Sequence, residues 1–355
     1  MLWLLLLWAW IASAASSEDW FRNWLLSHEV DLRLLHTFAK EEETMEGIQS
    51  LVWVDDTPGV LLSIPTALTL HPDSVPEYKP LTVELDPQRV LVLTLVLERQ
   101  KGNESFWFPY LNQLPAQYNT PEYWSSEELS ELQSPPLEEH FASELEWWHT
   151  FHSEAEAALG RPIPFAEYAW ATSTVQARIF GVSDTLGLVL IPLVDQFRYH
   201  VHSTCEIQHV TSHNQSLVQV VATSLQPGQE IYLPSTLDSA SNLNSLSKHG
   251  RILLNNVHNT EQVKHGVLHS QPQPQELASM YASAQACVES IQTELDAAPT
   301  SLEQDQELLL GLGLGNQRTA LLFRSERKQT LRRNLAYCQS SSSSNWPTSN
   351  HDQEL

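Results

Sequence analysis

The stretch LTLVLERQKGNESFWFPYLNQLP, residues 93–115, carries the most informative pattern in the chain. It begins inside an apolar run that extends from Val90 to Leu97, and Glu98, Arg99 and Lys101 follow this run directly. A nearly continuous apolar run that ends in charged residues is typical of a buried segment that reaches the surface at its end. We therefore predict a buried helix here, followed by an aromatic segment.

Strand signals lie on both sides of this predicted helix. Before it, residues 51–70 contain two aliphatic runs around a cluster of Asp, Pro and Gly, which predicts strand, turn and strand. After it, residues 121–160 mix acidic and apolar side chains at helical spacing, which predicts helices. Short β-rich runs then return at Val189–Leu193, Leu217–Ala222 and Glu230–Leu233.

The C-terminal third of the chain has a different composition. The segment QPQPQ, residues 271–275, is typical of a linker, and the pattern from Glu276 to Tyr337 is helical without strand signals. Within it, GLGLGNQ, residues 311–317, lacks the spacing of a dinucleotide-binding loop and predicts a turn between helices. The serine-rich tail, residues 339–355, is predicted to be disordered.

Composition excludes several classes of function. The 355 residues carry 19 Lys and Arg against 43 Asp and Glu, a formal net charge of −24, so we expect no nucleic-acid partner. Three cysteines allow at most one disulfide. The spacing of the densest histidine group suits no familiar metal site, so we predict no metal; its members are His200, His202, His209 and His213.

Both ends of the chain predict a secretory-pathway protein. The start, MLWLLLLWAWIASA, has the apolar run and the small residues of a cleaved signal peptide over residues 1–14, so we expect no membrane anchor afterwards. The end, HDQEL, is close to the HDEL-type retention signal, and predicts the endoplasmic reticulum lumen. Secretion, with HDQEL as an ordinary acidic tail, is the alternative. Glycosylation sequons at Asn103 and Asn214 are compatible with both.

Four segments, in this order along the chain, share the motifs of one family. They are residues 93–115, YAWATSTVQARIFG at 168–181, LVLIPLVDQF at 188–197, and the region 298–331 with APTSLEQDQELL and ALLFRSERKQTL. Together they resemble the SET-domain protein methyltransferases of the Rubisco large-subunit and actin-histidine type. The resemblance implies an α+β fold, with a SET domain over 20–265, its helical insert over about 85–180, and an α-helical substrate-binding-like domain over 276–338.

The same resemblance implies S-adenosylmethionine as cofactor and a protein as substrate, but only part of the family's site is present. Arg178 matches the family's arginine near the cofactor, and Asp195 matches the first residue of its Asp-x-x-Asn-His signature. Arg198 and Tyr199 stand where Asn and His would fall. Of the family's glycine-rich turn only Gly47 remains, and Ser235 stands in place of the catalytic tyrosine.

This pattern favours a pseudoenzyme of the secretory pathway, with weak or lost methyltransferase activity, that acts by binding a protein partner. The alternative is an active protein-lysine N-methyltransferase that uses S-adenosylmethionine. A third hypothesis is a lumenal structural module with neither ligand nor stable partner. The last predicted helix carries a stripe of basic residues, which are Arg324, Arg327, Lys328, Arg332 and Arg333. We interpret this stripe as a solvated face, and the alternative is a docking face for an acidic partner.

Overall fold

The computed structural model describes residues 17–32, 35–37, 51–53, 59–75, 85–183, 185–200, 203–212, 215–223, 231–234, 277–278, 280–313, 315–341 and 346. The chain divides into two compact units that are interleaved in sequence. Unit 1 comprises residues 1–118 and 148–235, and unit 2 comprises residues 119–147 and 236–355. Residues 119–147 therefore group with the C-terminal helices, whereas the sequence assigned them to the helical insert of the SET domain.

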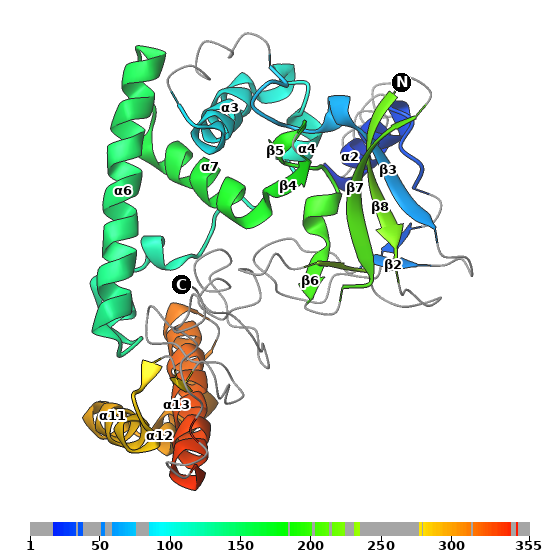
Figure 1. The fold of residues 1–355 in the computed structure, drawn as a ribbon. Coiled ribbons are helices and arrows are strands. Elements are labelled where there is room, and N and C mark those ends of the chain that lie inside the picture. Colours follow the sequence, from blue (N-terminus) through cyan, green and yellow to red (C-terminus); the bar gives the residue numbers. More distant parts are fainter. Residues whose placement is uncertain are drawn as a thin grey trace, which may run out of the picture. The chain divides into compact units, whose positions relative to one another are not determined.

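The strands of unit 1 form small sheets (Figure 1). The largest has β8 (Gln215–Ala222) between β3 (Val60–Pro65) and β7 (Cys205–Ser212), and both pairs are antiparallel. Three further pairs are described. β1 (Leu35–Thr37) pairs with β2 (Leu51–Trp53), β4 (Phe180–Ser183) with β5 (Gly187–Val189), and β6 (Arg198–His200) with β9 (Tyr232–Pro234). Residues 51–70 thus contain two strands, as predicted, but in different sheets.

The predicted buried helix over Val90–Leu97 is confirmed as part of α3 (Pro87–Lys101). Asp86 caps its first turn by accepting hydrogen bonds from the backbone N–H groups of Gln88 and Arg89. The helix ends at Gly102, whose φ of 57° suits a residue without a side chain. Residues 90–96 are all buried, which explains why this helix is apolar around its whole circumference rather than on one stripe.

Unit 1 also contains the second half of α6 (Pro135–Leu159). Its other helices are α2 (Ser17–Ser27), α4 (Phe108–Leu111), α7 (Phe165–Arg178), and the single turns η1 (Thr66–Leu68), η3 (Gly102–Glu104) and η5 (Val194–Gln196). The predicted strand over Val189–Leu193 is wrong beyond its beginning, because β5 ends at Val189. Leu190 forms an isolated bridge with Leu70, and the chain then turns through Leu193, at φ 73°, into η5.

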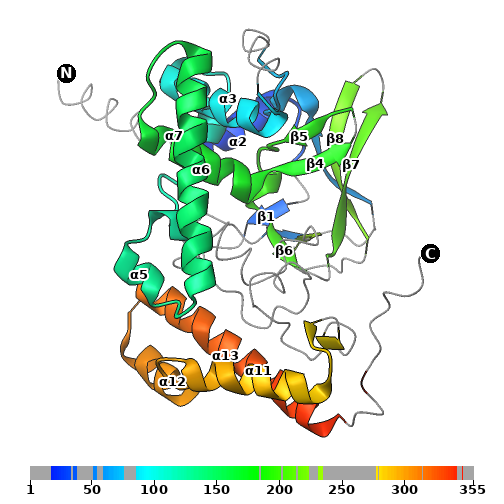
Figure 2. The same cartoon turned by 60° about the vertical axis from the view of Figure 1, so that its left-hand side comes forward.

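The regular elements described in unit 2 are all helices. It contains η4 (Pro121–Tyr123), α5 (Ser126–Ser130), the first half of α6 (Pro135–Leu159), α11 (Ala284–Ala297), α12 (Leu302–Gly311) and α13 (Asn316–Ser340). Figure 2 shows α11, α12 and α13 packed together. The predicted turn at residues 311–317 is confirmed, since α12 ends at Gly311 and α13 begins after Gly315.

One disulfide ties unit 2 together. Cys287 on α11 is bonded to Cys338 on α13, and both sulfurs lie in an apolar cluster with Leu277, Ile291 and Leu331. In the tail, the indole N–H of Trp346 donates a hydrogen bond to the carbonyl of Tyr281 at 3.2 Å. Within the described ranges, none of the helices combines the length and the apolar character that a membrane crossing requires.

Candidate functional site

Two of the residues predicted to bind the cofactor lie together in the core of unit 1. Arg178 is the last residue of α7, and Asp195 lies in η5, which follows β5. Arg178 Nη1 donates a hydrogen bond to the backbone carbonyl of Asp195 at 3.0 Å and lies 3.4 Å from its Oδ2. The two residues are only 4% and 3% exposed, so they form a buried ion pair.

Two tyrosines complete this buried cluster. The hydroxyl of Tyr110, on α4, donates a hydrogen bond to Asp195 Oδ2 at 2.7 Å. The hydroxyl oxygen of Tyr118 accepts one from Arg178 Nε at 3.3 Å. Asp195 Oδ1 has no hydrogen-bond partner among the described residues. We define these four residues, Tyr110, Tyr118, Arg178 and Asp195, as the Arg178–Asp195 cluster.

Burial dominates the electrostatics of this cluster. It raises the pKa of Asp195, and the neighbouring Arg178 works against that rise. Burial also opposes the positive charge of Arg178, but the facing oxygens of Tyr118 and Asp195 more than compensate and raise its pKa. The pKa of Tyr110 lies well above its usual value, through burial and the Asp195 carboxylate, so its hydroxyl remains a donor.

The other predicted site residues are not brought into this cluster by the described structure. Gly47 and Ser235 lie outside the described residues. Arg198 and Tyr199 lie on β6, whose backbone pairs in parallel with Tyr232 and Leu233 of β9. The assignment of these residues to a cofactor site therefore stays a prediction.

In the described part of the predicted site, Arg178 contacts Asp195 and Tyr118, and neither Arg178 nor Asp195 is exposed. Asp195 Oδ1 has no partner there. A role of these two residues in cofactor binding stays a prediction. The sequence analysis did not identify Tyr110 and Tyr118 as members of this site. Tyr110 lies within the aromatic segment 93–115, and a tyrosine hydroxyl among apolar residues indicates a buried hydrogen-bond partner.

The predicted solvated face of α13 is wrong for Arg324 and Lys328, which are buried and paired within unit 2, whereas Arg332 and Arg333 are exposed. Arg324 Nε contacts Asp305 Oδ1 at 3.0 Å, and its Nη1 contacts Glu131 Oε2 at 2.6 Å. Lys328 Nζ contacts Asp305 Oδ2 at 2.6 Å. Both cationic side chains are buried, as is Asp305. The spacing of charges along the helix could not show that α12 supplies a buried carboxylate to two of them.

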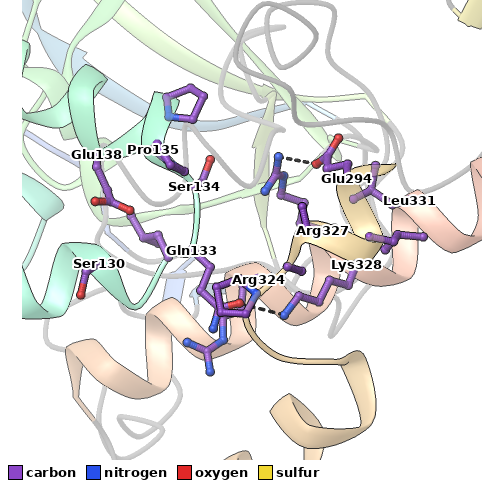
Figure 3. Close-up of a pocket in the computed structure, with 16 residues that line it drawn as sticks. Ser130, Gln133, Ser134, Pro135, Glu138, Glu294, Arg324, Arg327, Lys328 and Leu331 are labelled. Carbon is purple, nitrogen blue, oxygen red and sulfur yellow. Dashed lines mark hydrogen bonds and ion pairs between the residues drawn. The ribbon is translucent and has the colours of Figure 1, made fainter. Parts of the chain in front are cut away.

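The same residues line a cleft of about 430 Å³ in unit 2 (Figure 3). Arg327 is paired with Glu294, and Lys328 Nζ also donates a hydrogen bond to Gln133 Oε1 at 3.0 Å, as the dashed lines show. The hydroxyl of Ser134, a buried side chain of the lining, has no partner in the described part of the chain. The remaining lining is largely apolar and includes Leu132, Pro135, Pro136, Leu295, Ala298, Pro299 and Leu331.

The histidines do not form a metal site in the described part of the chain. No group of three or more His, Cys, Asp or Glu side chains there could hold a metal ion. His209, the one member of the dense group whose side chain is described, contacts Ser183 through Nδ1 at 3.0 Å and Ser216 through Nε2 at 2.7 Å.

Comparison with known proteins gives relatives but no family profile that matches the chain. Over 205 residues the chain is 29% identical to the Rubisco large subunit N-methyltransferase of Pisum sativum, covering 55% of this chain and 41% of that protein. Over 195 residues it is 28% identical to the actin-histidine N-methyltransferase of Xenopus tropicalis, covering 50% and 32%. The chain thus spans less than half the length of these curated relatives.

Solved structures match over almost the whole chain. The SET domain of Rubisco large-subunit methyltransferase bound to lysine and AdoHcy superposes with a TM-score of 0.69 at 18% identity, covering 92% of each chain. The same type of enzyme bound to AdoMet gives 0.64 at 19% identity, again over 92% of each. The predicted fold class, an α+β SET fold with appended helices, is confirmed.

Proposed function

We propose that this chain, a SET-fold relative of the Rubisco large-subunit and actin-histidine methyltransferases, binds a protein partner and has weak or no methyltransferase activity. The observation that supports this most directly is the Arg178–Asp195 cluster. The two residues that match the family's cofactor motifs contact each other inside the core. In this arrangement they stabilise the junction of α7 and η5, a role that needs no ligand.

The replaced motif positions support the same proposal. A methyltransferase of this type needs a narrow channel that aligns the methyl group with the acceptor nitrogen. Ser235 lacks the aromatic ring and the hydroxyl reach of the tyrosine that lines this channel in the family, and Arg198 and Tyr199 are much larger than the Asn and His they replace. The scaffold has therefore been kept while the side chains that the chemistry needs have changed.

Isothermal titration calorimetry with S-adenosylmethionine tests the proposal. We expect no saturable heat of binding to the full chain, and no methyl transfer to peptides that contain Lys or His. Saturable, tight binding together with methyl transfer would overturn the loss of catalysis. Binding of S-adenosylmethionine without transfer would still leave a non-catalytic protein and would locate the change in the acceptor channel.

An active protein-lysine N-methyltransferase is the second candidate, and the retention of both Arg178 and Asp195 favours it. In that case an Arg178→Met variant should lose cofactor affinity. A Tyr118→Phe variant, which removes a neighbouring hydroxyl of the same cluster, should keep it. A lumenal structural module, the third hypothesis, would show neither cofactor binding nor a stable partner.

We also propose that the protein resides in the secretory pathway, in the endoplasmic reticulum lumen rather than outside the cell. The Cys287–Cys338 disulfide supports an oxidising compartment. Asn103 lies exposed in η3, where a glycan can be attached without disturbing the core. The predicted signal peptide and the HDQEL end lie outside the described residues.

Endoglycosidase H treatment of the protein from cells tests this localisation. We expect a mobility shift that becomes smaller or disappears in an Asn103→Gln variant. Retention predicts that the glycan stays sensitive to the enzyme and that replacement of the last four residues releases the protein into the medium. A chain without any shift, with its first residues uncleaved, would contradict the proposal.

A further inference from the structure

A second cleft, of about 250 Å³, lies in unit 1 on the side of α3 where that helix ends. It lies between the end of α3, helix α4 with the segment after it, and α7. Its lining is formed by Arg99, Gly102, Phe108, Leu111, Asn112, Leu114, Pro115, Ala116 and Trp170. Most of these side chains are apolar, and the cleft contains a single charged residue, Arg99.

Arg99 is positioned by an aromatic ring rather than by a carboxylate. Its guanidinium carbon lies 3.8 Å from the ring centroid of Trp170, a cation–π contact. The indole is itself fixed, because its N–H donates a hydrogen bond to the carbonyl of Pro115 at 2.8 Å. Among the described residues no carboxylate pairs with Arg99, although Arg89, on the same helix, contacts both Asp86 and Glu154.

The cleft continues into an exposed aromatic surface. Phe108, which lines the cleft, lies 6.1 Å from Trp20 of α2 between ring centroids. Trp20 is 51% exposed. Exposed apolar side chains that continue a cleft mark interaction surfaces more often than isolated apolar residues do. We define Trp20, Phe108, Arg99 and Trp170 as the Arg99 surface.

We propose that the Arg99 surface binds a segment of a partner protein in which an Asp or Glu stands next to aromatic or aliphatic side chains. The acidic group would pair with the Arg99 guanidinium, and the apolar neighbours would cover Phe108 and the exposed ring of Trp20. Trp, Phe and Arg anchors are the residue types that dominate protein interfaces. This proposal names the surface for the partner-binding role proposed above and rests on that role.

Charge complementarity selects this occupant over others. The chain as a whole has a net charge of −24, so an anionic membrane surface would be repelled by most of the protein. A short acidic and apolar segment meets only the local field, where Arg99 supplies the positive charge. The aromatic neighbours also lower the local dielectric constant, which strengthens a pair with one carboxylate.

Peptide display tests the proposal. The full chain, produced in the bacterial periplasm so that its disulfide forms and Asn103 carries no glycan, is panned against a phage library of random twelve-residue peptides. We expect the selected peptides to share an Asp or Glu beside an aromatic or aliphatic residue. A synthetic peptide of the selected sequence should bind Arg99→Glu at least about tenfold more weakly than wild type, since one lost anchor typically costs this much.

A charge exchange makes the test specific. Replacing the acidic residue of that peptide with Lys should weaken binding to wild type and restore binding to Arg99→Glu. Arg333→Glu in unit 2 is the matched control and should bind like wild type, while Trp20→Ser should weaken binding through the aromatic contact alone. Selected peptides without an acidic residue, equal binding by Arg99→Glu, or no selected peptide would each overturn the proposal.

These outcomes are independent of catalysis, because the assay contains no S-adenosylmethionine. Tight cofactor binding would contradict the lost activity and leave the Arg99 surface intact. Failure of peptide selection would remove this surface and leave open a partner that binds elsewhere. The full chain should not bind vesicles of anionic lipid. Vesicle binding that Trp20→Ser abolishes would also overturn the proposal.

Discussion

At the scale of single residues, the carboxylate of Asp195 is expected to stabilise the core of unit 1. Its carboxylate oxygen Oδ2 lies 3.4 Å from Arg178 Nη1 in the core, and it also accepts the Tyr110 hydrogen bond. An Asp195→Ala variant leaves the buried guanidinium without its counter-charge, so we expect a loss of about 3–5 kcal/mol in the free energy of unfolding. Urea unfolding of the full chain measures it.

Tyr110→Phe is the control for this prediction. It removes one hydrogen bond to Asp195 while the ion pair remains, so the expected loss is about 1 kcal/mol. If Asp195→Ala costs no more than Tyr110→Phe, the ion pair contributes little and Arg178 finds its counter-charge elsewhere. The cofactor-independent role of the Arg178–Asp195 cluster would then lose its support.

Glu122, in η4, should make the stability of unit 2 depend on pH. Burial raises the pKa of its carboxyl from 4.5 to about 7, and Glu144 adds to the rise, opposed by Thr120. Between these two values the folded protein holds a proton that the unfolded chain releases, so raising the pH through this window favours unfolding. We expect a loss of about 3 kcal/mol between about pH 4 and about pH 8.

Because other carboxyl groups titrate in the same range, the informative quantity is the difference between wild type and Glu122→Gln. The amide of Gln cannot ionise, so the variant should lack this component of the pH dependence. Chemical denaturation at several pH values measures both proteins. Parallel curves for the two proteins would show that Glu122 ionises as freely in the folded chain as in the unfolded one.

At the scale of elements, α13 shows how tertiary pairing overrides a sequence pattern. Asp305 of α12 contacts both Arg324 and Lys328, and all three side chains are buried. Asp305→Ala leaves two buried cations without this carboxylate, and we expect a loss of about 3–5 kcal/mol. Hydrogen exchange at the amides of α12 and α13 should accelerate and measures the loss locally.

The exposed pair on the same two helices provides the comparison. Arg332 contacts Glu303 at 2.5 Å, but both side chains lie in solvent. Arg332→Ala should therefore leave the exchange rates of α12 and α13 close to those of wild type, because exposed pairs are screened. Similar effects of Asp305→Ala and Arg332→Ala would mean that burial does not distinguish the two contacts.

α3 and β5 show where sequence patterns succeed and fail. A nearly continuous apolar run followed by Arg99 and Lys101 predicted α3, because the charges mark where the helix reaches the surface. The apolar run after Val189 has the composition of a strand, yet only Leu190 pairs, in an isolated bridge with Leu70, and the backbone turns at Leu193. The periodicity of a segment does not show which distant residue it pairs with.

At the scale of the whole molecule, the cysteine count and the fold together predict the thiol chemistry. The chain has three cysteines, of which Cys287 and Cys338 are bonded and Cys205 is buried with its pKa raised by burial to about 12. Ellman's reagent should find almost no reactive thiol in the native protein, one after denaturation, and three after denaturation with reduction. Two or more thiols in the denatured, unreduced protein would contradict the disulfide.

Reduction should also destabilise unit 2. The bond closes a loop of 51 residues between α11 and α13, and disulfides of this kind contribute about 2–5 kcal/mol, chiefly by restricting the unfolded chain. The unfolding midpoint of the protein with and without a reducing agent measures this. A Cys205→Ala variant is the control and should respond to reduction as wild type does.

The sequence by itself determined the fold class, the helical C-terminal region and the buried helix α3, and it predicts the positions at which the family's catalytic side chains are replaced. These features depend on local periodicity and on motifs within short segments, so they can be predicted without a structure. Only the tertiary structure decided that Arg178 and Asp195 face each other, that residues 119–147 join the C-terminal unit, and that Arg324 and Lys328 are buried against Asp305. Each of these depends on which distant segments meet, and contacts between distant segments leave no period in a single sequence.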